Sequence, residues 1–478
     1  MRNDKCAINI AQYCVRNLRR IAVWHPVRVP GPGPLAGERY HLIGVAGRGL
    51  APLAVVCRHL GAEVDGCDRA GGPDTLAWLA AQEFEVMPGH DPAHLAPGVT
   101  PVATSVADTD HPEVSAARAD GLWHRTDLLA HVLRQRPSVG VTGSHGKGTV
   151  AALTTAALVR AGADPLALLG LEAPELGGYA RLGAGPIAAE VDDSDNSLSR
   201  VDTDVAVVTA LDDDHPHLDV SLDQKVGGVG EYVGRARTRV LLGAGPRTDR
   251  LAAYARADVW RFGNELGGRV VSRRGTETVV ELRAPGGLRA EATLRTLVVK
   301  PAMNAALAWA GAVSVGADPA AAAEGLGTLT TITRRMEVLG ERDGVTVVDD
   351  MGGKHPASVR AALETLRRHF PDSRVVAVFE PCAMFMARWG NRYARALGAA
   401  DEVLVLPEFG SVGYDLGPAY DPEWPRACRA PLRRVPDHTV AAAEAMALAR
   451  PGDVAIFLTQ RATSRWMAEL ALSGAASS

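Results

Sequence analysis

Hydrophobic residues recur along the chain at two spacings, alternate positions and helical turns, and the two kinds of segment follow one another. The apolar run YHLIGV at residues 40–45 meets a glycine-rich stretch, and apolar side chains at residues 50–60 then share one face of an expected helix. A second strand-like segment, AEVDGCD, follows at residues 62–68. The order strand, turn, helix and strand favours a parallel sheet. Residues 100–105 form another candidate strand, and residues 126–133 a helix.

The same cycle begins again at Ser138 and a third time near Arg334. The second unit holds SVGVTGSHGKGT, a long helix after it, and further β-rich runs that include an antiparallel-looking segment at residues 276–284. The third unit holds GVTVVDD at residues 344–350, a helix that opens at Pro356, and three more strand-like runs. We therefore expect an α/β protein built from three successive units.

The length of 478 residues allows three domains of about 100–200 residues each. Residues 1–37 lack strand alternation and end in a turn-rich stretch, so they are expected to be an irregular extension or to reflect a mistaken start site. We divide the remainder into an N-terminal domain at 38–137, a central domain at 138–332 and a C-terminal domain at 333–478.

The net charge and the cysteine pattern limit the kinds of partner and the cellular compartment that we expect. A formal net charge of -4 provides no basic field for a polyanion, so nucleic acid is not an expected partner. The six cysteines are scattered, with no CxxC pair and no Cys/His cluster at zinc-ligand spacing, which indicates reduced thiols in a cytoplasmic protein. No apolar run approaches the roughly 18–20 residues of a membrane helix, and the N-terminus lacks a signal-peptide pattern. A membrane partner is not expected either.

The strongest local signal is TGSHGKGT at residues 142–149, between a β-rich strand and a helix. A bound phosphate chain needs close backbone N–H groups, a helix N-terminus, a lysine for the outer phosphates and a hydroxyl for Mg²⁺. The expected nucleotide-binding segment comprises Gly143, Ser144, His145, Gly146, Lys147, Gly148 and Thr149. The alternative is an ordinary glycine turn with a solvated lysine.

Two acidic clusters follow or end apolar strands in the same unit. The first, AEVDDSDNS, contains Glu190, Asp192, Asp193 and Asp195. The second, ALDDDHPHLD, contains Asp212, Asp213, Asp214, His215, His217 and Asp219. Either cluster alone is more typical of a solvated acidic loop. Because ligands bind at the carboxyl ends of such strands and a nucleoside triphosphate brings a divalent cation, the two together indicate a metal site.

The order of these motifs resembles the Mur ligases, and within that family the alanine-adding branch. The phosphate loop is followed by AE.D.SD, by DH after a strand, by an NAAL helix, and by RR, VDD and HP. The resemblance spans about residues 40–478 and implies a Rossmann-like N-terminal domain for the UDP end of a substrate, a central ATP-binding domain and a C-terminal Rossmann-like ligase domain. It also implies ATP and Mg²⁺ as cofactors.

The resemblance implies roles for individual residues. The nucleotide site would contain Lys147 and Arg335 at the ATP phosphates, Asn304 at adenine, Asp350 near the ribose, and Thr149, Asp193 and His215 at magnesium. His355 matches a histidine beside the substrates, where it would orient the amine or accept its proton; a merely structural histidine at a helix start is the alternative. The UDP site would contain Gly44, Gly47, Gly49 and Asp68, although such a glycine-rich turn also fits an NAD site.

Several positions depart from the family pattern. The usual Lys-Thr-Thr is KGT at residues 147–149, a form similar to folylpolyglutamate synthases, and the metal-binding glutamate is Asp193. A family asparagine, tyrosine, histidine and arginine are replaced by Ala210, Met351, Cys382 and Ala383. An arginine that pairs with a carboxylate contributes about 1.5–3 kcal/mol, so its loss predicts altered recognition of the acceptor amine.

Together these residues predict an ATP-dependent, ADP-forming ligase that joins a carboxylate to an amino acid or another amine through an acyl-phosphate. Its substrates are a UDP-sugar carboxylate and an amino acid of cell-wall synthesis, or altered ones in specialised metabolism. The alternatives are a nucleotide-binding relative without ligase activity and an unrelated phosphate-loop kinase or NTPase. Lys225 is too close to His215 to match the carbamylated lysine of many Mur ligases, and Asp349 is expected in a solvent-facing or capping position.

Overall fold

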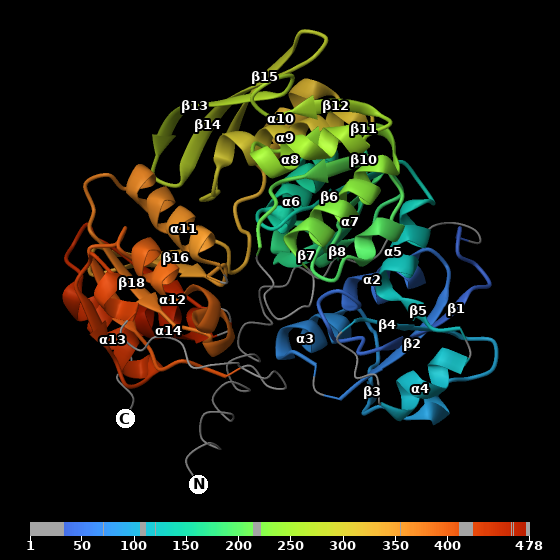
Figure 1. The fold of residues 1–478 in the computed structure, drawn as a ribbon, viewed down its shortest axis with the longest axis horizontal. Helices are drawn as coiled ribbons and strands as arrows, with labels where there is room; N and C mark the ends of the chain where they lie inside the picture. The colour runs from blue at the N-terminus through green and yellow to red at the C-terminus, as the bar shows by residue number, and fades with distance from the viewer. Residues whose placement is uncertain are drawn as a thin grey trace.

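The computed structural model describes residues 33–474, apart from residues 70, 106–110, 120, 214–220, 354, 411–423, 460 and 462. The strands form four sheets, and the ribbon follows an arc from the N-terminal sheet through the central sheet to the C-terminal one (Figure 1). The expected α/β class with three successive units is confirmed. We propose domain boundaries at 137/138 and 332/333, because each sheet lies within one of the resulting segments.

The first sheet has five strands in the order β3-β2-β1-β4-β5, and all neighbours are parallel, as expected. Its strands are β1 (Arg39–Ile43), β2 (Glu63–Asp68), β3 (Met87–Pro88), β4 (Thr100–Ala103) and β5 (Trp123–His124). Its helices are α2 (Ala51–His59), α3 (Pro73–Ala81), η2 (Pro92–His94), α4 (Pro112–Ala119) and α5 (Arg125–Leu133). The central strand β1 is buried at all positions but the first, as a strand covered on both faces must be.

The central sheet has seven strands in the order β12-β11-β10-β6-β9-β7-β8. They are β6 (Ser138–Thr142), β7 (Leu166–Ala173), β8 (Gly178–Arg181), β9 (Ile187–Glu190), β10 (Thr203–Val208), β11 (Ala236–Leu242) and β12 (Asp258–Arg261). Neighbours are parallel except for β7 with the edge strand β8. The associated helices are α6 (Lys147–Arg160), η3 (Pro174–Leu176), η4 (Ser197–Arg200), α7 (Leu222–Gly234), α8 (Pro246–Arg250), η5 (Leu251–Tyr254), α9 (Pro301–Ser314) and α10 (Pro319–Leu326).

A small sheet beyond β12 is antiparallel throughout, which confirms the antiparallel segment expected from the sequence. It consists of β13 (Gly267–Arg274), β14 (Glu277–Ala284) and β15 (Leu288–Leu294). In the ribbon it lies at the outer edge of the arc, between the central sheet and helix α11 (Pro356–His369) of the C-terminal domain (Figure 1).

The C-terminal sheet has six strands in the order β16-β17-β21-β18-β19-β20. They are β16 (Glu337–Arg342), β17 (Val345–Asp350), β18 (Val375–Phe379), β19 (Glu402–Val405), β20 (Leu432–Arg434) and β21 (Val454–Leu458). The helices are α11 (Pro356–His369), α12 (Ala383–Leu397), η6 (Trp424–Ala427), α13 (His438–Leu448) and α14 (Thr463–Ser473). The edge strand β16 runs antiparallel to β17, and the other pairs are parallel.

Two apolar cores fix the helix that follows the phosphate loop. The face of α6 expected to be buried, Val150, Leu153, Ala157 and Leu158, has no exposed area. These side chains pack with α9 and α10 in a core on one face of the central sheet. The opposite face of that sheet shares a second core with α2 and α5 of the N-terminal domain. The central sheet, whose strand β6 leads into α6, is therefore held between two packed layers.

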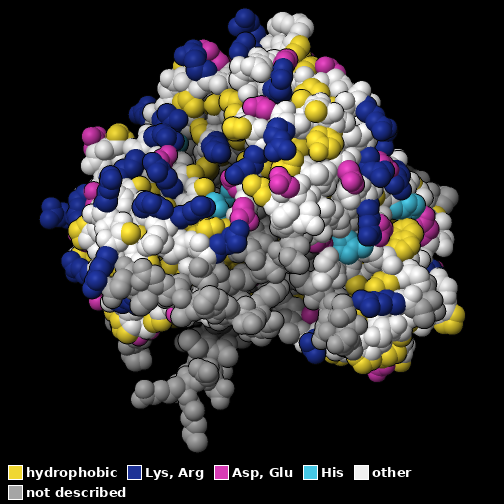
Figure 2. Space-filling model, viewed as in Figure 1, with side chains coloured by type: hydrophobic (Ala, Val, Ile, Leu, Met, Phe, Trp, Pro, Cys, Tyr) yellow, Lys and Arg dark blue, Asp and Glu magenta, His cyan; other side chains and the backbone are white. Residues whose placement is uncertain are grey.

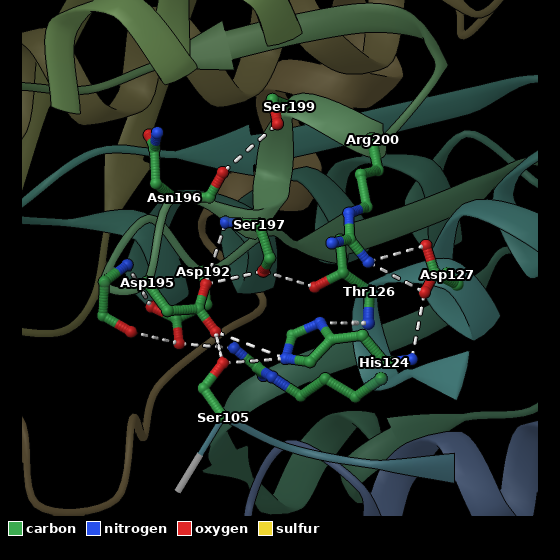
Figure 3. A network of polar contacts seen from close by, with 12 residues as sticks. Ser105, His124, Thr126, Asp127, Asp192, Asp195, Asn196, Ser197, Ser199 and Arg200 are labelled. Carbon is green, nitrogen blue, oxygen red and sulfur yellow. Dashed lines mark hydrogen bonds and ion pairs between the residues drawn. The ribbon is translucent and has the colours of Figure 1, made fainter. Parts of the chain in front are cut away.

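Polar contacts join the N-terminal and central domains beside the first acidic cluster (Figure 3). Asp195 accepts a hydrogen bond from the Ser105 hydroxyl and lies 3.4 Å from Nε2 of His124. Two further pairs across this boundary are Thr126 with Ser197 and Asp127 with Arg200. Burial raises the pKa of Asp195, but the hydrogen bonds from His124, Ser105 and Ser197 outweigh it and hold that pKa well below its usual range. Asp195 is thus an ionised carboxylate used at the domain junction.

The expected exposed or capping position of Asp349 is wrong. Asp349 has no exposed area, because β17 lies between β16 and β21 and is covered by α14. Burial raises the pKa of Asp349 from 3.8 to about 7, although the charge of Arg465 opposes the rise. The folded protein therefore keeps a proton on this carboxyl that the unfolded chain releases at lower pH.

This raised pKa predicts a pH-dependent stability difference. The stabilisation from protonated Asp349 is complete below about pH 4 and is lost as the pH rises through about 7. Relative to wild type, Asp349→Asn should therefore gain thermal stability progressively between these values. Thermal midpoints of both proteins from pH 4 to pH 8 measure the difference, with Asp343→Asn at an exposed turn as the control. A difference between Asp349→Asn and wild type that stays constant with pH would contradict the assignment.

The surface on the side seen in Figure 2 mixes Lys and Arg with Asp and Glu side chains over all three domains. Among the residues that the structure describes, no helix has both the length and the apolar character of a membrane span.

Candidate active site

A cavity of about 490 Å³ lies where the three domains meet. Its lining includes residues 144–149 of the phosphate loop and side chains from the domains on either side. The expected site residues among them are Gly49, Ser144, His145, Gly146, Lys147, Gly148, Thr149, Asn304, Arg335, Asp350 and His355. The fold thus gathers into one cavity residues that are about 300 positions apart in the chain.

The phosphate loop is a tight connection between β6 and α6. Gly143 and Gly146 have φ values of +119° and +89°, which side chains other than glycine rarely adopt. A Cβ on Gly143 would also lie 2.6 Å from the carbonyl oxygen of Ala210. That carbonyl accepts a hydrogen bond of 2.7 Å from the Ser144 amide. The loop is therefore held by the backbone of residue 210 and not by its side chain. The change of a family asparagine to Ala210 therefore leaves this anchor in place.

Lys147 opens α6 and meets a buried carboxylate. Its Nζ lies 2.7 Å from Oδ1 of Asp193, and Nζ of Lys225, on α7, lies 2.7 Å from Oδ2. Asp193 has no exposed area, so two cations offset the cost of desolvating it. From the sequence, Lys225 was considered only as a possible carbamylated lysine, and its contact with Asp193 was not predicted. The available signal was a lysine at a buried position of α7, in helical register with Val229.

Glu190 lies against the start of α6, at the end of β9. A Cβ on Gly148 would be 2.8 Å from its Oε2, and one on Gly170 would be 2.3 Å from its Cδ. Burial raises the pKa of Glu190, and the charge of Lys147 opposes the rise. Glycine at 148, where the family pattern has threonine, thus leaves room for this carboxylate.

Asp192 is directed to the N-terminal domain, where Arg125 pairs with it at 2.5 Å. Burial raises the pKa of Asp192, but Arg125 and then Lys147 outweigh it and lower that pKa to about 2. Sequence reasoning did not identify Arg125, because its partner is 67 positions away in the chain. The first acidic cluster therefore serves two purposes, with Asp193 at the phosphate loop and Asp192 at the domain contact.

Asn304 reaches the phosphate loop from α9. A Cβ on Gly146 would lie 3.4 Å from its amide group, and its Nδ2 donates a hydrogen bond of 2.8 Å to the Val299 carbonyl. Its Oδ1 is buried and has no hydrogen-bond partner among the described residues. A buried acceptor at a cavity wall needs a donor, and the amino group of a purine would supply one.

The C-terminal domain contacts the loop through His355 and Ser358. The His355 ring lies 5.3 Å from that of His145, and the Ser358 hydroxyl lies 3.2 Å from Nδ1 of His145. Nδ1 of His355 accepts the backbone N–H of Ala357 at 3.1 Å, so His355 caps α11. The capping contact supports the structural alternative for His355, while its ring also faces the cavity. On its other side lies Trp389, at 4.7 Å.

Arg335 and Asp350 lie together at the cavity wall. Burial raises the pKa of Asp350, and the charge of Arg335 opposes the rise. The adjacent Arg334 pairs with Asp74 of the N-terminal domain at 2.9 Å. A second contact between those two domains runs from Arg48 to Met351, in the position of the family tyrosine. The first and third domains therefore meet at the cavity.

The other expected residues lie outside the cavity lining. Gly44 and Gly47 form the turn after β1, in which the Ala46 amide donates a hydrogen bond of 3.0 Å to Oδ2 of Asp68. Gly143, in the phosphate loop, and Asp193, paired with Lys147, also lie outside the lining. His215 falls in residues 214–220, outside the described residues.

Comparisons with known proteins match this architecture. The description "Mur ligase family, catalytic domain" matches residues 39–137, and "Mur ligase, glutamate ligase domain" matches residues 334–461. A UDP-N-acetylmuramate–L-alanine ligase of Kineococcus radiotolerans is 36% identical over 440 residues, which cover 87% of this chain and 92% of that protein. The chain belongs to the Mur ligase family. It is an ATP-dependent, ADP-forming ligase that makes amide bonds, as the sequence predicted.

Solved structures show the same fold for this Mur ligase. The UDP-N-acetylmuramate–alanine ligase of Thermotoga maritima superposes with a TM-score of 0.73 at 20% identity, over 91% of this chain and 100% of that one. A murein peptide ligase of Psychrobacter arcticus gives a TM-score of 0.64 at 19% identity, over 92% and 100%. The three-domain Mur ligase architecture is confirmed, and family membership replaces the alternatives of a dinucleotide-binding enzyme and of an unrelated kinase.

Proposed function

We propose that this Mur ligase activates the carboxylate of a UDP-N-acetylmuramate-like acid and transfers it to an amine whose recognition differs from that of the alanine-adding relatives. The observation that supports the first part is the phosphate loop with Lys147 in a cavity bordered by all three domains, where Lys147 pairs with the buried Asp193. In this assignment Lys147 holds the terminal phosphate, Arg335 lies beside the phosphate chain, and Asn304 contacts the base.

Magnesium fits the oxygen donors beside Lys147. The Thr149 hydroxyl and the Asp193 carboxylate would hold it, with His215 as the third expected ligand. Bound there, the ion would neutralise charge on the phosphate oxygens. Asp193 is paired with two lysines in this structure, so nucleotide binding must exchange the Lys147–Asp193 pair for a Lys147–phosphate contact. Lys225 can remain on Asp193 during that exchange.

The protein groups position and neutralise rather than react. The acid substrate attacks the terminal phosphate in line and forms an acyl-phosphate and ADP, and the amine then displaces phosphate from the activated carbonyl. Lys147 stabilises the charge on the transferred group. His355 and Trp389 lie on the C-terminal side of the loop, where the amine would approach.

The altered amine recognition rests on the start of α12. Cys382 is buried in the apolar core of the C-terminal domain, where the family pattern has a histidine, and Ala383 replaces the arginine. Phe385 and Trp389 stack at 5.6 Å in the following turn. Both rings are buried in the core of the C-terminal domain, so this segment carries apolar side chains where the family pattern has a cation for an amino-acid carboxylate.

ADP release tests both parts of the proposal. Purified protein is incubated with ATP, Mg²⁺ and UDP-N-acetylmuramate, and amines are then added in matched pairs of an amino acid and its amide. We expect turnover only when both acid and amine are present, with the acid and amide forms used within about tenfold of each other because no arginine holds the carboxylate. A preference of about 100-fold or more for the free carboxylate would contradict the altered-amine proposal. No turnover with this acid across the amine panel would contradict the proposed acid.

A further inference from the structure

A second cluster of chemically active side chains lies in the N-terminal domain, apart from the cavity. Ligand atoms of His41, Cys67, His94 and Glu113 all lie within 4.8 Å of one another. They come from β1, β2, η2 and α4 respectively. Zinc-ligand spacing did not reveal them in the sequence, since each belongs to a different element. The parallel sheet and α4, which packs on its strands and against η2, bring them together.

The distances suit a small tetrahedral ion. The Glu113 Oε1 oxygen lies 3.0 Å from Nε2 of His41 and 3.2 Å from Nδ1 of His94, and Oε2 lies 3.1 Å from Sγ of Cys67. Ligands bound at about 2.0–2.3 Å around a tetrahedral zinc ion are separated by about 3.3–3.8 Å. The Glu113 distances lie within a few tenths of an ångström of this range and the other ligand pairs lie within 4.8 Å, so side-chain shifts without a change of fold would form a coordination shell.

The cluster is largely buried, which distinguishes it from a chance grouping of exposed side chains. The side chains of His41, Cys67 and Glu113 have no exposed area, and that of His94 is 18% exposed. His90 also lies 3.2 Å from Oε2 of Glu113 and borders the one partly open side. A metal ion would enter past His90 and His94, release the thiol proton of Cys67 to solvent, and pair with the buried carboxylate and thiolate.

A carboxylate also orients one imidazole. Nδ1 of His41 is hydrogen-bonded to Asp65, its register neighbour on β2, so Nε2 is the atom presented to the cluster. Metal-binding histidines commonly donate their other ring N–H to a carboxylate in this way. Asp65 therefore supplies the outer contact that such a site requires.

We propose that His41, Cys67, His94 and Glu113 bind a Zn²⁺ ion. Two imidazoles, one thiolate and one carboxylate form a donor set that suits zinc and disfavours Mg²⁺ or Ca²⁺, which prefer oxygen ligands. Four protein ligands close the coordination shell, as in structural zinc sites. The ion would tie β1 and β2 to η2 and α4.

The site would also brace the glycine-rich turn. The carbonyl of Cys67 accepts hydrogen bonds from the amides of Gly44 and Val45, at 2.8 Å and 3.0 Å. Fixing Cys67 therefore fixes the turn that follows β1. This effect does not depend on the proposed substrates, because it concerns the stability of the N-terminal domain.

Metal content measures the proposal directly. Untagged protein is treated with a chelator under reducing conditions, reloaded with zinc chloride, passed through a desalting column and analysed by mass spectrometry of its metals. We expect about one zinc ion per wild-type chain and less than about a tenth of that for Cys67→Ser. Cys428→Ser, which removes a thiol of the C-terminal domain outside the cluster, should retain the wild-type content.

A zinc titration of the chelator-treated wild-type protein tests the proposal even if Cys67→Ser fails to fold. Zinc added to chelator-treated protein should raise its thermal midpoint by about 5–10 °C. Cobalt in place of zinc should give a thiolate-to-metal absorption band that Cys67→Ser lacks. Wild-type protein that retains no zinc and gains no thermal stability would overturn the proposal, and so would zinc retention that Cys67→Ser and His94→Ala leave unchanged.

Discussion

Lys147→Ala is expected to lower ADP formation by at least about 10²–10³-fold, the loss typical of removing one fixed donor from a charged transition state. Lys147 begins α6 in the cavity, at the position where the phosphate-loop lysine reaches the outer phosphates. Phosphoryl transfer depends on neutralisation by charges at fixed positions, so the loss of this one slows the reaction even when Arg335 and Mg²⁺ remain. Initial rates with saturating substrates measure the effect.

The fold should survive this substitution. Lys225 remains 2.7 Å from Oδ2 of Asp193, so the buried carboxylate keeps one cation. The matched control is Arg160→Ala at the other end of α6, where an exposed pair with Glu324 contributes little. We expect its rate to stay within about twofold of wild type. A Lys147→Ala protein with a wild-type rate would show that the phosphate site lies elsewhere.

The phosphate loop and the helix after it were predictable because all their determinants are contiguous. A buried strand, glycines that permit positive φ, a lysine and an apolar helical face occur within about 20 residues, and local pattern is sufficient for such a unit. The parallel arrangement of β1, β2 and β4 followed from the same strand and helix alternation.

Contacts between elements were not predictable in the same way. Lys225 meets Asp193 only after α7 packs on the central sheet, and Asp349 is buried because β17 lies between β16 and β21 and is covered by α14. The cluster around Glu113 likewise joins four elements. In each case the residue type was visible in the sequence, but its partner depends on packing that periodicity does not encode.

Helix α12 is another feature whose contacts were not predictable from the sequence. The segment was interpreted through two missing family side chains, whereas the structure shows a helix that begins at Ala383 and has a non-helical residue at Trp389. The kink places Trp389 against both Phe385 and His355. This packing of aromatic rings results from the kink in the backbone of α12.

Asp193→Asn is expected to destabilise the protein by about 3–5 kcal/mol, the typical cost of leaving a buried charge without its partner. Lys147 and Lys225 both approach Asp193 to 2.7 Å, and their own side chains are 12% and 7% exposed. Without the carboxylate, two ammonium groups would face each other in a site that water hardly reaches. Chemical denaturation measures the change, and Asp193→Glu, which restores the family residue and keeps the charge, is the matched control.

A second substitution shows whether the instability of Asp193→Asn is caused by unpaired charge or by loss of packing. Lys225→Met in the Asp193→Asn background removes one of the two facing cations and keeps an apolar stem of similar length. If repulsion and desolvation cause the instability, the double variant should recover at least about half of the lost free energy. Additive losses in the double variant would mean that Asp193 and Lys225 do not act as a pair. The pairing then could not explain the buried position of Asp193 beside the phosphate loop.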